Sequence, residues 1–265
     1  LLSRWPRSKS RTPAARCAPC SRPGGQMPMP LDKQASGIRP QASGRSQPSG
    51  APRPGPWGLG PALGRSFYER PTLVVAAELI GKVLAHRTKA GVVAGMIVEV
   101  EAYIGEDDPA CHAAPGLTTR NAPLYGPPGH AYVYLNYGIH RLVNAVTEAE
   151  GSPAAGLIRA LEPLDGVNLM AARRSRGRAP VDEKELCRGP GNLTQALGIT
   201  LDQNRADLVG GPLRIEDRRF DVEPISWGPR TGIQRGVDRK RRWRGGGHRP
   251  RPGAAAAPRT RHGRG

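Results

Sequence analysis

Residues 96–112, which read MIVEVEAYIGEDDPACH, constrain the fold and the function of this chain more than any other stretch. Alternate side chains of a strand point to opposite faces, so the apolar residues at 96, 98, 100 and 102 predict one face packed on a core. The other face then carries Ile97, Glu99, Glu101 and Tyr103, and the polar loop that follows is expected to return His112 to this face. Carboxylates, a phenol ring and an imidazole held on a rigid strand are typical of a catalytic pocket. The alternative is a solvated strand face without chemistry.

The net charge of +18 is unevenly distributed along the chain. Residues 1–64 and residues 236–265 each hold ten Lys or Arg and one acidic residue, which leaves 20 of the 40 basic and 20 of the 22 acidic residues in the middle. Residues 65–235 are therefore neutral, and the overall charge alone does not show that the folded part binds nucleic acid.

Both ends of the chain are predicted to be disordered. Residues 1–64 are rich in Pro, Gly, Ser and Arg, residues 236–265 are rich in Arg, Gly, Ala and Pro, and neither segment has periodic apolar content. Such segments bury too little apolar surface to offset the entropy cost of ordering. We therefore expect a single compact domain over residues 65–235, flanked by two disordered basic tails.

The cellular location is predicted from apolar runs and cysteines. No run resembles a secretory signal or approaches the ~18 apolar residues of a membrane span, so we expect a cytoplasmic, nucleoid-associated or nuclear protein that is not secreted and contacts no membrane. The four cysteines indicate no disulfide framework, which favours a reducing compartment. The Arg-rich and Ser-rich N-terminal segment weakly resembles an organelle transit peptide.

Between the tails, the pattern predicts short helices and antiparallel strands. Helices are expected after Thr72, over residues 165–173 and over residues 189–198, and strands over residues 82–87, 92–103, 142–146, 156–161 and 212–216. Arg159 stands at an otherwise apolar strand position, so it needs a carboxylate partner, for which Glu99 and Glu101 are the candidates. That pair could be purely structural or part of a catalytic site.

Tyrosines cluster in the second informative stretch, GHAYVYLNYGIHRLVNAV, which covers residues 129–146. By alternation Tyr132 and Tyr134 share a strand face, and we expect Tyr132 in the core. Tyr137 stands beside Gly138 where that strand turns. An exposed ring at a turn is poorly suited to packing and well suited to insertion between flat bases.

Two further features are candidate phosphate contacts. The only dense basic cluster of the neutral middle is formed by Arg173, Arg174, Arg176 and Arg178. The helix expected over residues 189–198 begins with a Gly-Pro-Gly turn, and its first amide groups could also receive a phosphate. Ordinary helix capping is the alternative for that second feature.

Five motifs in order resemble the alkyladenine (3-methyladenine) DNA glycosylase family. They are RSFYERPT-x-x-V-A-x-x-L-I-G-K-V-L from residue 65, E-V-E-A-Y-x-G-x-x-D-P-A-C-H from residue 99, A-Y-V-Y-x-x-Y-G-x-H-x-x-x-N from residue 131, L-I-R-A-L-E-P-L-x-G from residue 157 and L-C-x-G-P-G-x-L-x-Q-A-L-G-I from residue 186. The resemblance covers residues 65–235, and the sequence after GPRTGI departs from the family pattern.

The resemblance implies a monofunctional DNA glycosylase. Such an enzyme flips an alkylated or deaminated purine, such as 3-methyladenine, out of duplex DNA and hydrolyses its N-glycosidic bond, which initiates base excision repair. The implied fold is α+β, one compact domain around a curved antiparallel sheet with short helices. The implied partner is double-stranded DNA containing damaged purines, with no cofactor and no metal, and we expect a monomer.

The resemblance also implies roles for residues at matching motif positions. Glu101 would be the general base, and Arg159 would help to hold the attacking water. The walls of the base pocket would be Tyr103, His112 and Tyr134. Asn144 would sit at the pocket floor as a selectivity filter, and Tyr137 would be the wedge in the minor groove.

Three other interpretations are open. A metal hydrolase could use Glu101, His112, His130 and His140, but their spacing matches no common ligand pattern. A lyase would need a lysine beside the pocket, and the three lysines of residues 65–235 lie in no recognised motif. The third is a non-catalytic damage-binding or architectural DNA-binding protein, whose basic tails would supply nonspecific affinity.

Overall fold

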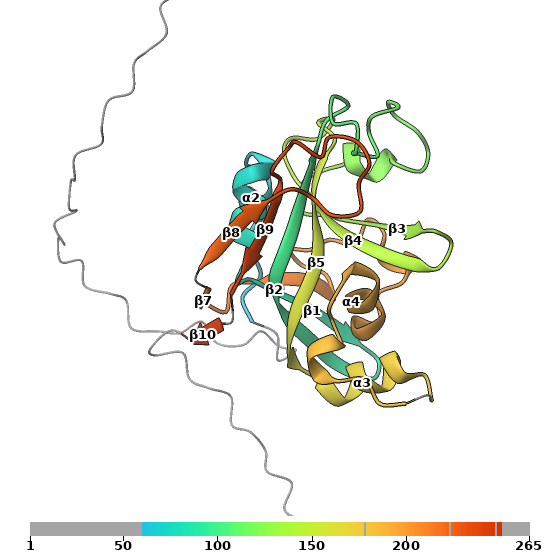
Figure 1. Cartoon of the computed structure of the whole chain (residues 1–265), viewed down its shortest axis with the longest axis vertical. Helices are drawn as coiled ribbons and strands as arrows, with labels where there is room; N and C mark the ends of the chain where they lie inside the picture. The colour runs from blue at the N-terminus through green and yellow to red at the C-terminus, as the bar shows by residue number, and fades with distance from the viewer. Residues whose placement is uncertain (1–59, 178, 223, 247, 251–265) are drawn as a thin grey trace, which may run out of the picture. The chain divides into compact units, whose positions relative to one another are not determined.

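Strands β2 (Gly91–Ile104) and β5 (Ala154–Asp165) form the antiparallel centre of the fold (Figure 1). The computed structural model describes residues 60–250, except residues 178, 223 and 247. The expectations for residues 1–59 and 251–265 lie outside this range. Within it, an α+β fold around a curved antiparallel sheet is confirmed.

The sheet continues from this centre in both directions. Its strand order is β3-β4-β5-β2-β1-β6. The outer strands are β1 (Val83–Thr88), β3 (Ala131–Asn136), β4 (His140–Val146) and β6 (Leu213–Glu216). Residues 91–96 of β2 pair with β1, and residues 99–101 pair with β9 (Arg242–Gly245), which also pairs with β8 (Ile225–Gly228). Strand β2 therefore has neighbours along both edges.

Short helices cover the sheet, and three of them lie where the sequence predicted a helix. They are α1 (Arg65–Tyr68), α2 (Thr72–Leu79), α3 (Val167–Ser175) and α4 (Pro190–Leu197), with the 3₁₀ turns η1 (Ala122–Tyr125), η2 (Glu183–Glu185) and η3 (Leu201–Gln203). Helix α2 packs on β2 and β5, and α4 packs on β4 and β5. Pro190 begins α4, and Gly198 ends it with a φ of 68°, which is the usual placement of these residues at helix ends. No helix among residues 60–250 has the length and apolar character to cross a membrane.

Strand β2 differs from the expectation of one buried and one polar face. Ile97 and Glu101 are as fully buried as Met96 and Val100. The register between β2 and β5 shifts at Glu99, a bulge that interrupts the simple alternation. The segment between β8 and β9 also hydrogen-bonds to the end of β2 and covers Glu101. The carboxylate is thus inside the protein and not on a solvated face.

The expected domain boundary at residue 235 is corrected by β9. Opposite Glu99–Glu101 of β2, residues 242–244 form a ladder in which Trp243 packs against the core. The ordered domain therefore continues past residue 235, and a small second sheet pairs β7 (Phe220–Val222) with β10 (His248–Pro250). The expected start at residue 65 is also slightly late, because the buried Leu63 donates its N–H to Ile215 O at 2.8 Å.

Candidate active site

The carboxylate of Glu101 is fully buried and accepts three hydrogen bonds. Its Oε2 accepts from the hydroxyl of Tyr103 at 2.9 Å and from Nη1 of Arg159 at 3.2 Å. Its Oε1 accepts from the backbone N–H of Thr231 at 2.7 Å. A buried charge requires such partners, because desolvation of an unpaired carboxylate is costly.

Arg159 on β5 joins both acidic residues of β2. Its Nε donates to Oε1 of Glu99 at 3.0 Å, while Nη1 binds Glu101. The expectation that Arg159 pairs with one of these glutamates is confirmed for both. From β9, Arg242 and Arg244 approach Glu99 at 3.6 Å and 3.9 Å, so three arginines surround the Glu99 carboxylate. Glu101 instead binds Tyr103 and Arg159, which both line the cavity.

A cavity of about 360 Å³ lies against the three groups that bind Glu101. Tyr103, Arg159 and Thr231 all line it, as do five residues from the loop, β3, β4 and their turn, namely His112, Tyr132, Tyr134, Tyr137 and Asn144. The volume is within the roughly 300–1,000 Å³ of small-ligand sites. The structure therefore brings the six residues expected at the catalytic centre and base pocket to one place, with Glu101 behind its three donors.

Aromatic rings form much of the cavity wall. The ring centroids of His112 and Tyr134 are 4.4 Å apart, and those of Tyr132 and Tyr134 are 5.2 Å apart. Tyr132 is 2% exposed, which confirms its expected place in the core, and its hydroxyl lies 2.9 Å from Nδ1 of His112. These contacts fix the rings relative to one another, so the cavity is preformed.

Burial sets the protonation states of this wall. It raises the pKa of Tyr132 to about 12 and raises the pKa of Tyr134 still further. For Tyr103, burial and then the charge of Glu101 raise the pKa of the phenol well above its usual value. Burial, followed by the charge of Arg120, lowers the pKa of His112. At neutral pH the phenols are therefore protonated donors and the imidazole is neutral.

Asn144 lies on β4 opposite Tyr132 and is nearly fully buried. Its Nδ2 donates to the backbone oxygen of Tyr132 at 2.9 Å. This bond fixes the side-chain amide where it lines the cavity.

The tip of the β3–β4 hairpin carries two exposed apolar side chains. Tyr137 is 85% exposed and has a φ of 49°, a left-handed conformation that is uncommon for a bulky residue. Ile139, two positions later, is also mostly exposed. The exposed position of Tyr137 is as expected. The exposure of Ile139 was not predicted, because the sequence around it has no periodic pattern of apolar residues.

The arginines expected to contact phosphate lie elsewhere. Arg173 donates to Ala196 O at 3.1 Å and to Thr88 Oγ1 at 3.0 Å, and Arg174 donates to Gln195 Oε1 at 2.9 Å. They hold α3 to α4 and do not line the cavity, so their contacts favour a structural role. Arg176 is exposed, and a phosphate contact there stays a prediction. Arg178 lies outside the described residues.

Sequence reasoning missed the segment that closes the site from the C-terminal side. Thr231, Gly232 and Ile233 line the cavity between β8 and β9, and Arg230 beside them binds Asp108 of the long loop. The sequence analysis noted only the run GPRTGI, and nothing in the sequence indicated that this run contacts the cavity. Within the described range, no three His, Cys, Asp or Glu side chains are grouped so as to hold a metal ion.

Comparison with known proteins decides the family. The model of the methylpurine-DNA glycosylase family matches residues 66–249. The chain belongs to this family. The match extends through β9 and into β10, in agreement with an ordered domain that continues past residue 235.

Relatives of this methylpurine-DNA glycosylase family member are similar over most of their length. A protein of Methanocella arvoryzae is 49% identical over 186 residues, 69% of this chain and 91% of its own. One of Rhodopseudomonas palustris (strain BisB5) is 52% identical over 194 residues, 73% of this chain and 90% of its own. Both carry the name "Putative 3-methyladenine DNA glycosylase". The resemblance inferred from the five motifs is confirmed, and the protein is a DNA glycosylase of base excision repair.

Proposed function

We propose that this glycosylase hydrolyses the N-glycosidic bond of alkylated or deaminated purines, 3-methyladenine among them, in double-stranded DNA and does not cleave the strand. The observation that carries the proposal is the buried Glu101 carboxylate, held with Arg159 against a preformed aromatic cavity. The family membership supports DNA as the substrate.

The damaged nucleotide must leave the duplex before it can reach Glu101. Extrusion of a base costs a few kcal/mol, and the cost is lowest for damaged or mismatched pairs. Tyr137 at the hairpin tip is exposed and near the cavity mouth, so its ring can fill the gap left in the stack.

The cavity wall suits a flat base that carries positive charge. The rings of Tyr103 and Tyr134 line the cavity, and a purine cation over such rings gains on the order of 1–2 kcal/mol when water is excluded. The neutral imidazole of His112 can donate one hydrogen bond to the base or to the sugar phosphate. Asn144 supplies a fixed amide that can distinguish between purine edges.

Glu101 acts as the general base on a water molecule aimed at C1′. The water oxygen forms a bond to C1′, the C1′–N bond breaks with its electron pair going to the purine, and the water proton goes to the carboxylate. A carboxylate has about four acceptor positions, and Tyr103, Arg159 and Thr231 occupy three, which leaves one for the water. A purine made cationic by alkylation leaves as a neutral base, so one carboxylate suffices where glycosidases acting on sugars use two. A neutral lesion such as hypoxanthine must also take up a proton as the bond breaks.

A second candidate function is a DNA-binding protein that recognises damage without turnover. The arrangement of Glu101, Arg159 and the cavity favours an enzyme, because binding alone requires no buried carboxylate facing the sugar. We also propose that the protein acts as a monomer, in the nucleoid or nucleus where its DNA is found.

Base release decides between these functions. The protein is incubated with methylated duplex and with hypoxanthine-containing duplex, and free base is measured by chromatography. We expect release of free purine and strands that break only after alkali treatment. Damage-specific binding without free base would support the non-catalytic alternative. Strand breaks before alkali, with a protein–DNA adduct trapped by borohydride, would show a lyase.

A further inference from the structure

We propose that Arg230 and Asp108 are positioning residues for Glu101. Their buried ion pair fixes the segment between β8 and β9 on the end of β2, so that the backbone N–H of Thr231 holds the carboxylate of Glu101. This inference rests on the proposed role of Glu101 as the general base.

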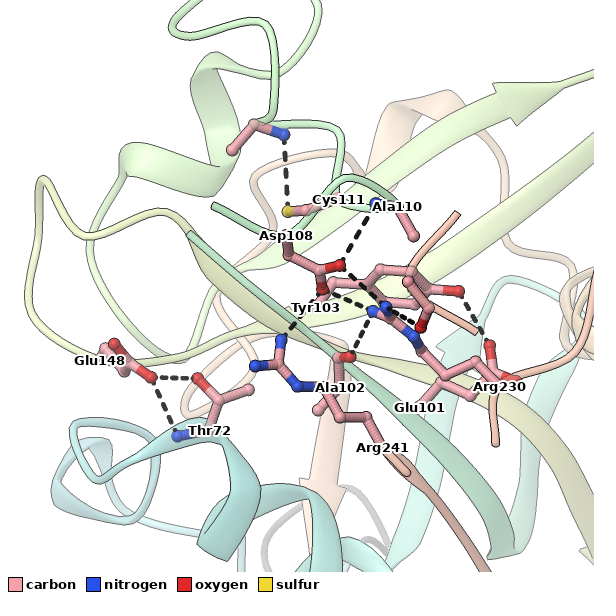
Figure 2. Close-up of polar contacts among 12 residues, drawn as sticks. Thr72, Glu101, Ala102, Tyr103, Asp108, Ala110, Cys111, Glu148, Arg230 and Arg241 are labelled. Atoms are coloured by element: carbon pink, nitrogen blue, oxygen red, sulfur yellow. Dashed lines mark hydrogen bonds and ion pairs between the residues drawn. The ribbon is translucent and has the colours of Figure 1, made fainter. Parts of the chain in front are cut away.

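The ion pair is bidentate (Figure 2) and buried. Nη1 and Nη2 of Arg230 lie 2.5 Å and 2.8 Å from the two carboxylate oxygens of Asp108, and both side chains are 0% exposed. Arg241 adds a bond of 3.1 Å to Oδ2 of Asp108. Burial alone would raise the pKa of Asp108, but the hydrogen bonds and charge of Arg230 outweigh it and lower the pKa, so the carboxylate is ionised.

The same arginines hold the backbone of β2 next to Glu101. Arg230 Nη1 donates to Ala102 O at 3.1 Å, and Ala102 donates its N–H to Arg241 O at 2.8 Å. The guanidinium of Arg230 also lies 4.6 Å from the ring centroid of Tyr103. Figure 2 shows Arg230 and Asp108 beside Ala102, Glu101 and Tyr103. The pair therefore contacts the two residues that follow Glu101 on the strand.

Thr231 follows Arg230 directly, so the position of its N–H depends on where the guanidinium is anchored. Among the hydrogen bonds of the described residues, that N–H is the only donor to the Glu101 carboxylate from outside β2 and β5, and it binds Oε1, whereas Tyr103 and Arg159 bind Oε2. A displaced segment would lose this bond and free the carboxylate to rotate. The acceptor position left for water would then no longer face the cavity.

A stabilising role alone explains the pair poorly. Desolvation of two charges offsets most of their attraction, and buried ion pairs can often be replaced by apolar residues at no loss of stability. A fixed geometry next to a catalytic group is a better reason for a bidentate Arg–Asp pair at this place, because two parallel bonds define an orientation as well as a distance.

Arg230→Lys in the full chain tests the inference, because lysine keeps the charge and cannot make the two parallel bonds. The matched control is Arg218→Lys. Arg218 binds Asp165 at 2.6 Å and Glu216 at 2.8 Å and does not line the cavity. Single-turnover excision of hypoxanthine and affinity for a duplex with a non-cleavable abasic analogue are measured for both. We expect Arg230→Lys to lower the excision rate roughly tenfold or more with affinity unchanged, and Arg218→Lys to change neither.

The Glu101→Gln background separates positioning from general disruption. If Arg230 acts through Glu101, Arg230→Lys lowers the rate in the wild type and causes no further loss beside Glu101→Gln, because groups that act as one unit are not additive. An equal loss in both backgrounds, a wild-type rate for Arg230→Lys, or a parallel loss of affinity would overturn the inference. A wild-type rate for Glu101→Gln itself would instead overturn the proposed function.

A measurement on the unaltered protein covers the case in which Arg230→Lys fails to fold. The amide proton of Thr231 should exchange slowly, since it is bonded to the buried carboxylate of Glu101, and more slowly than the amide protons of the exposed residues Arg235 and Val237. Exchange of Thr231 as fast as those neighbours would show that the segment is not held on Glu101 and would overturn the inference without any variant.

Discussion

The hydroxyl of Tyr103 donates a hydrogen bond of 2.9 Å to Oε2 of Glu101, two positions earlier on the same strand. Normally a strand places residues i and i+2 on one face, and here that geometry joins a wall of the base cavity to the proposed general base. The raised pKa of Tyr103 keeps the phenol protonated, so it stays a donor throughout the neutral range. Tyr103 therefore lines the cavity and also binds the carboxylate of Glu101.

Tyr103→Phe separates these two contacts, because it keeps the ring and removes the donor. A hydrogen bond to a charged group is worth about 1.5–3 kcal/mol, so we expect the single-turnover excision rate to fall roughly tenfold to a hundredfold. Affinity for lesion-containing duplex should stay the same, since the stacking surface is unchanged. An unaltered rate would show that Glu101 does not depend on this bond.

Tyr137→Ser tests the wedge at the hairpin tip. The side chain is 85% exposed and contributes little to the core, so the free energy of unfolding should hardly change. Lesion binding should weaken by about tenfold, because the stacking energy that compensates for the flipped base is lost. Ile139→Ser at the same tip provides a comparison for a second exposed apolar residue. A markedly lower unfolding midpoint for Tyr137→Ser would mark Tyr137 as a packing residue.

One buried histidine, His86, and one half-buried histidine, His112, predict a loss of stability in acid. Burial lowers the pKa of both His86 and His112, with added effects of Arg173 and Arg120 respectively. The folded state keeps these rings neutral, while the unfolded state protonates them below about pH 6.5, so the unfolded state binds more protons there. The free energy of unfolding should therefore decrease as the pH falls from 7.5 to 5.5.

Denaturant titrations at the two pH values measure this dependence. His86→Gln, outside the cavity, should reduce the difference, because one of the two titrating rings is then absent. Equal or higher stability of the wild type at pH 5.5 would contradict the buried neutral state of the rings.

The sequence predicted much of this arrangement and missed specific parts for physical reasons. Apolar periodicity together with Gly and Pro turns located β1, β2, β4, β5, β6 and the helices α2, α3 and α4, since these signals are local. Strand β9 was not predicted, because its four residues lie in an Arg-rich and Gly-rich stretch and its partner strand β2 is distant in sequence. A short run with one tryptophan has too little periodicity to indicate a strand.

The site shows the same division between local and distant signals. The motifs placed Glu101, Tyr103, His112, Tyr134 and Asn144 together. The last four line one cavity, and Glu101 is hydrogen-bonded to Tyr103. The Arg230–Asp108 pair joins residues 122 positions apart and therefore had no local signature. The burial of β2 on both faces was likewise unpredictable, because the covering segment belongs to the far end of the domain.

The basic tails are predicted to add affinity without selectivity. Full-length protein is compared with a 60–250 fragment, which keeps β9 and β10, on lesion-containing and undamaged duplex across a salt series. Each phosphate contact steepens the fall of log K with log salt by about 0.9, so the full-length protein should have the steeper slope on both duplexes. The fragment should keep its preference for the lesion. Loss of that preference would place the tails in the recognition surface.

Glu101→Gln tests the central claim most directly, because it neutralises the proposed base and keeps its shape. Single-turnover excision of hypoxanthine from duplex DNA should fall by about 10²–10⁴, the usual cost of losing a general base. Binding to a duplex with an abasic analogue should be unchanged. Excision at the wild-type rate would contradict the account and would transfer the role to Glu99, which now binds Arg159 at 3.0 Å.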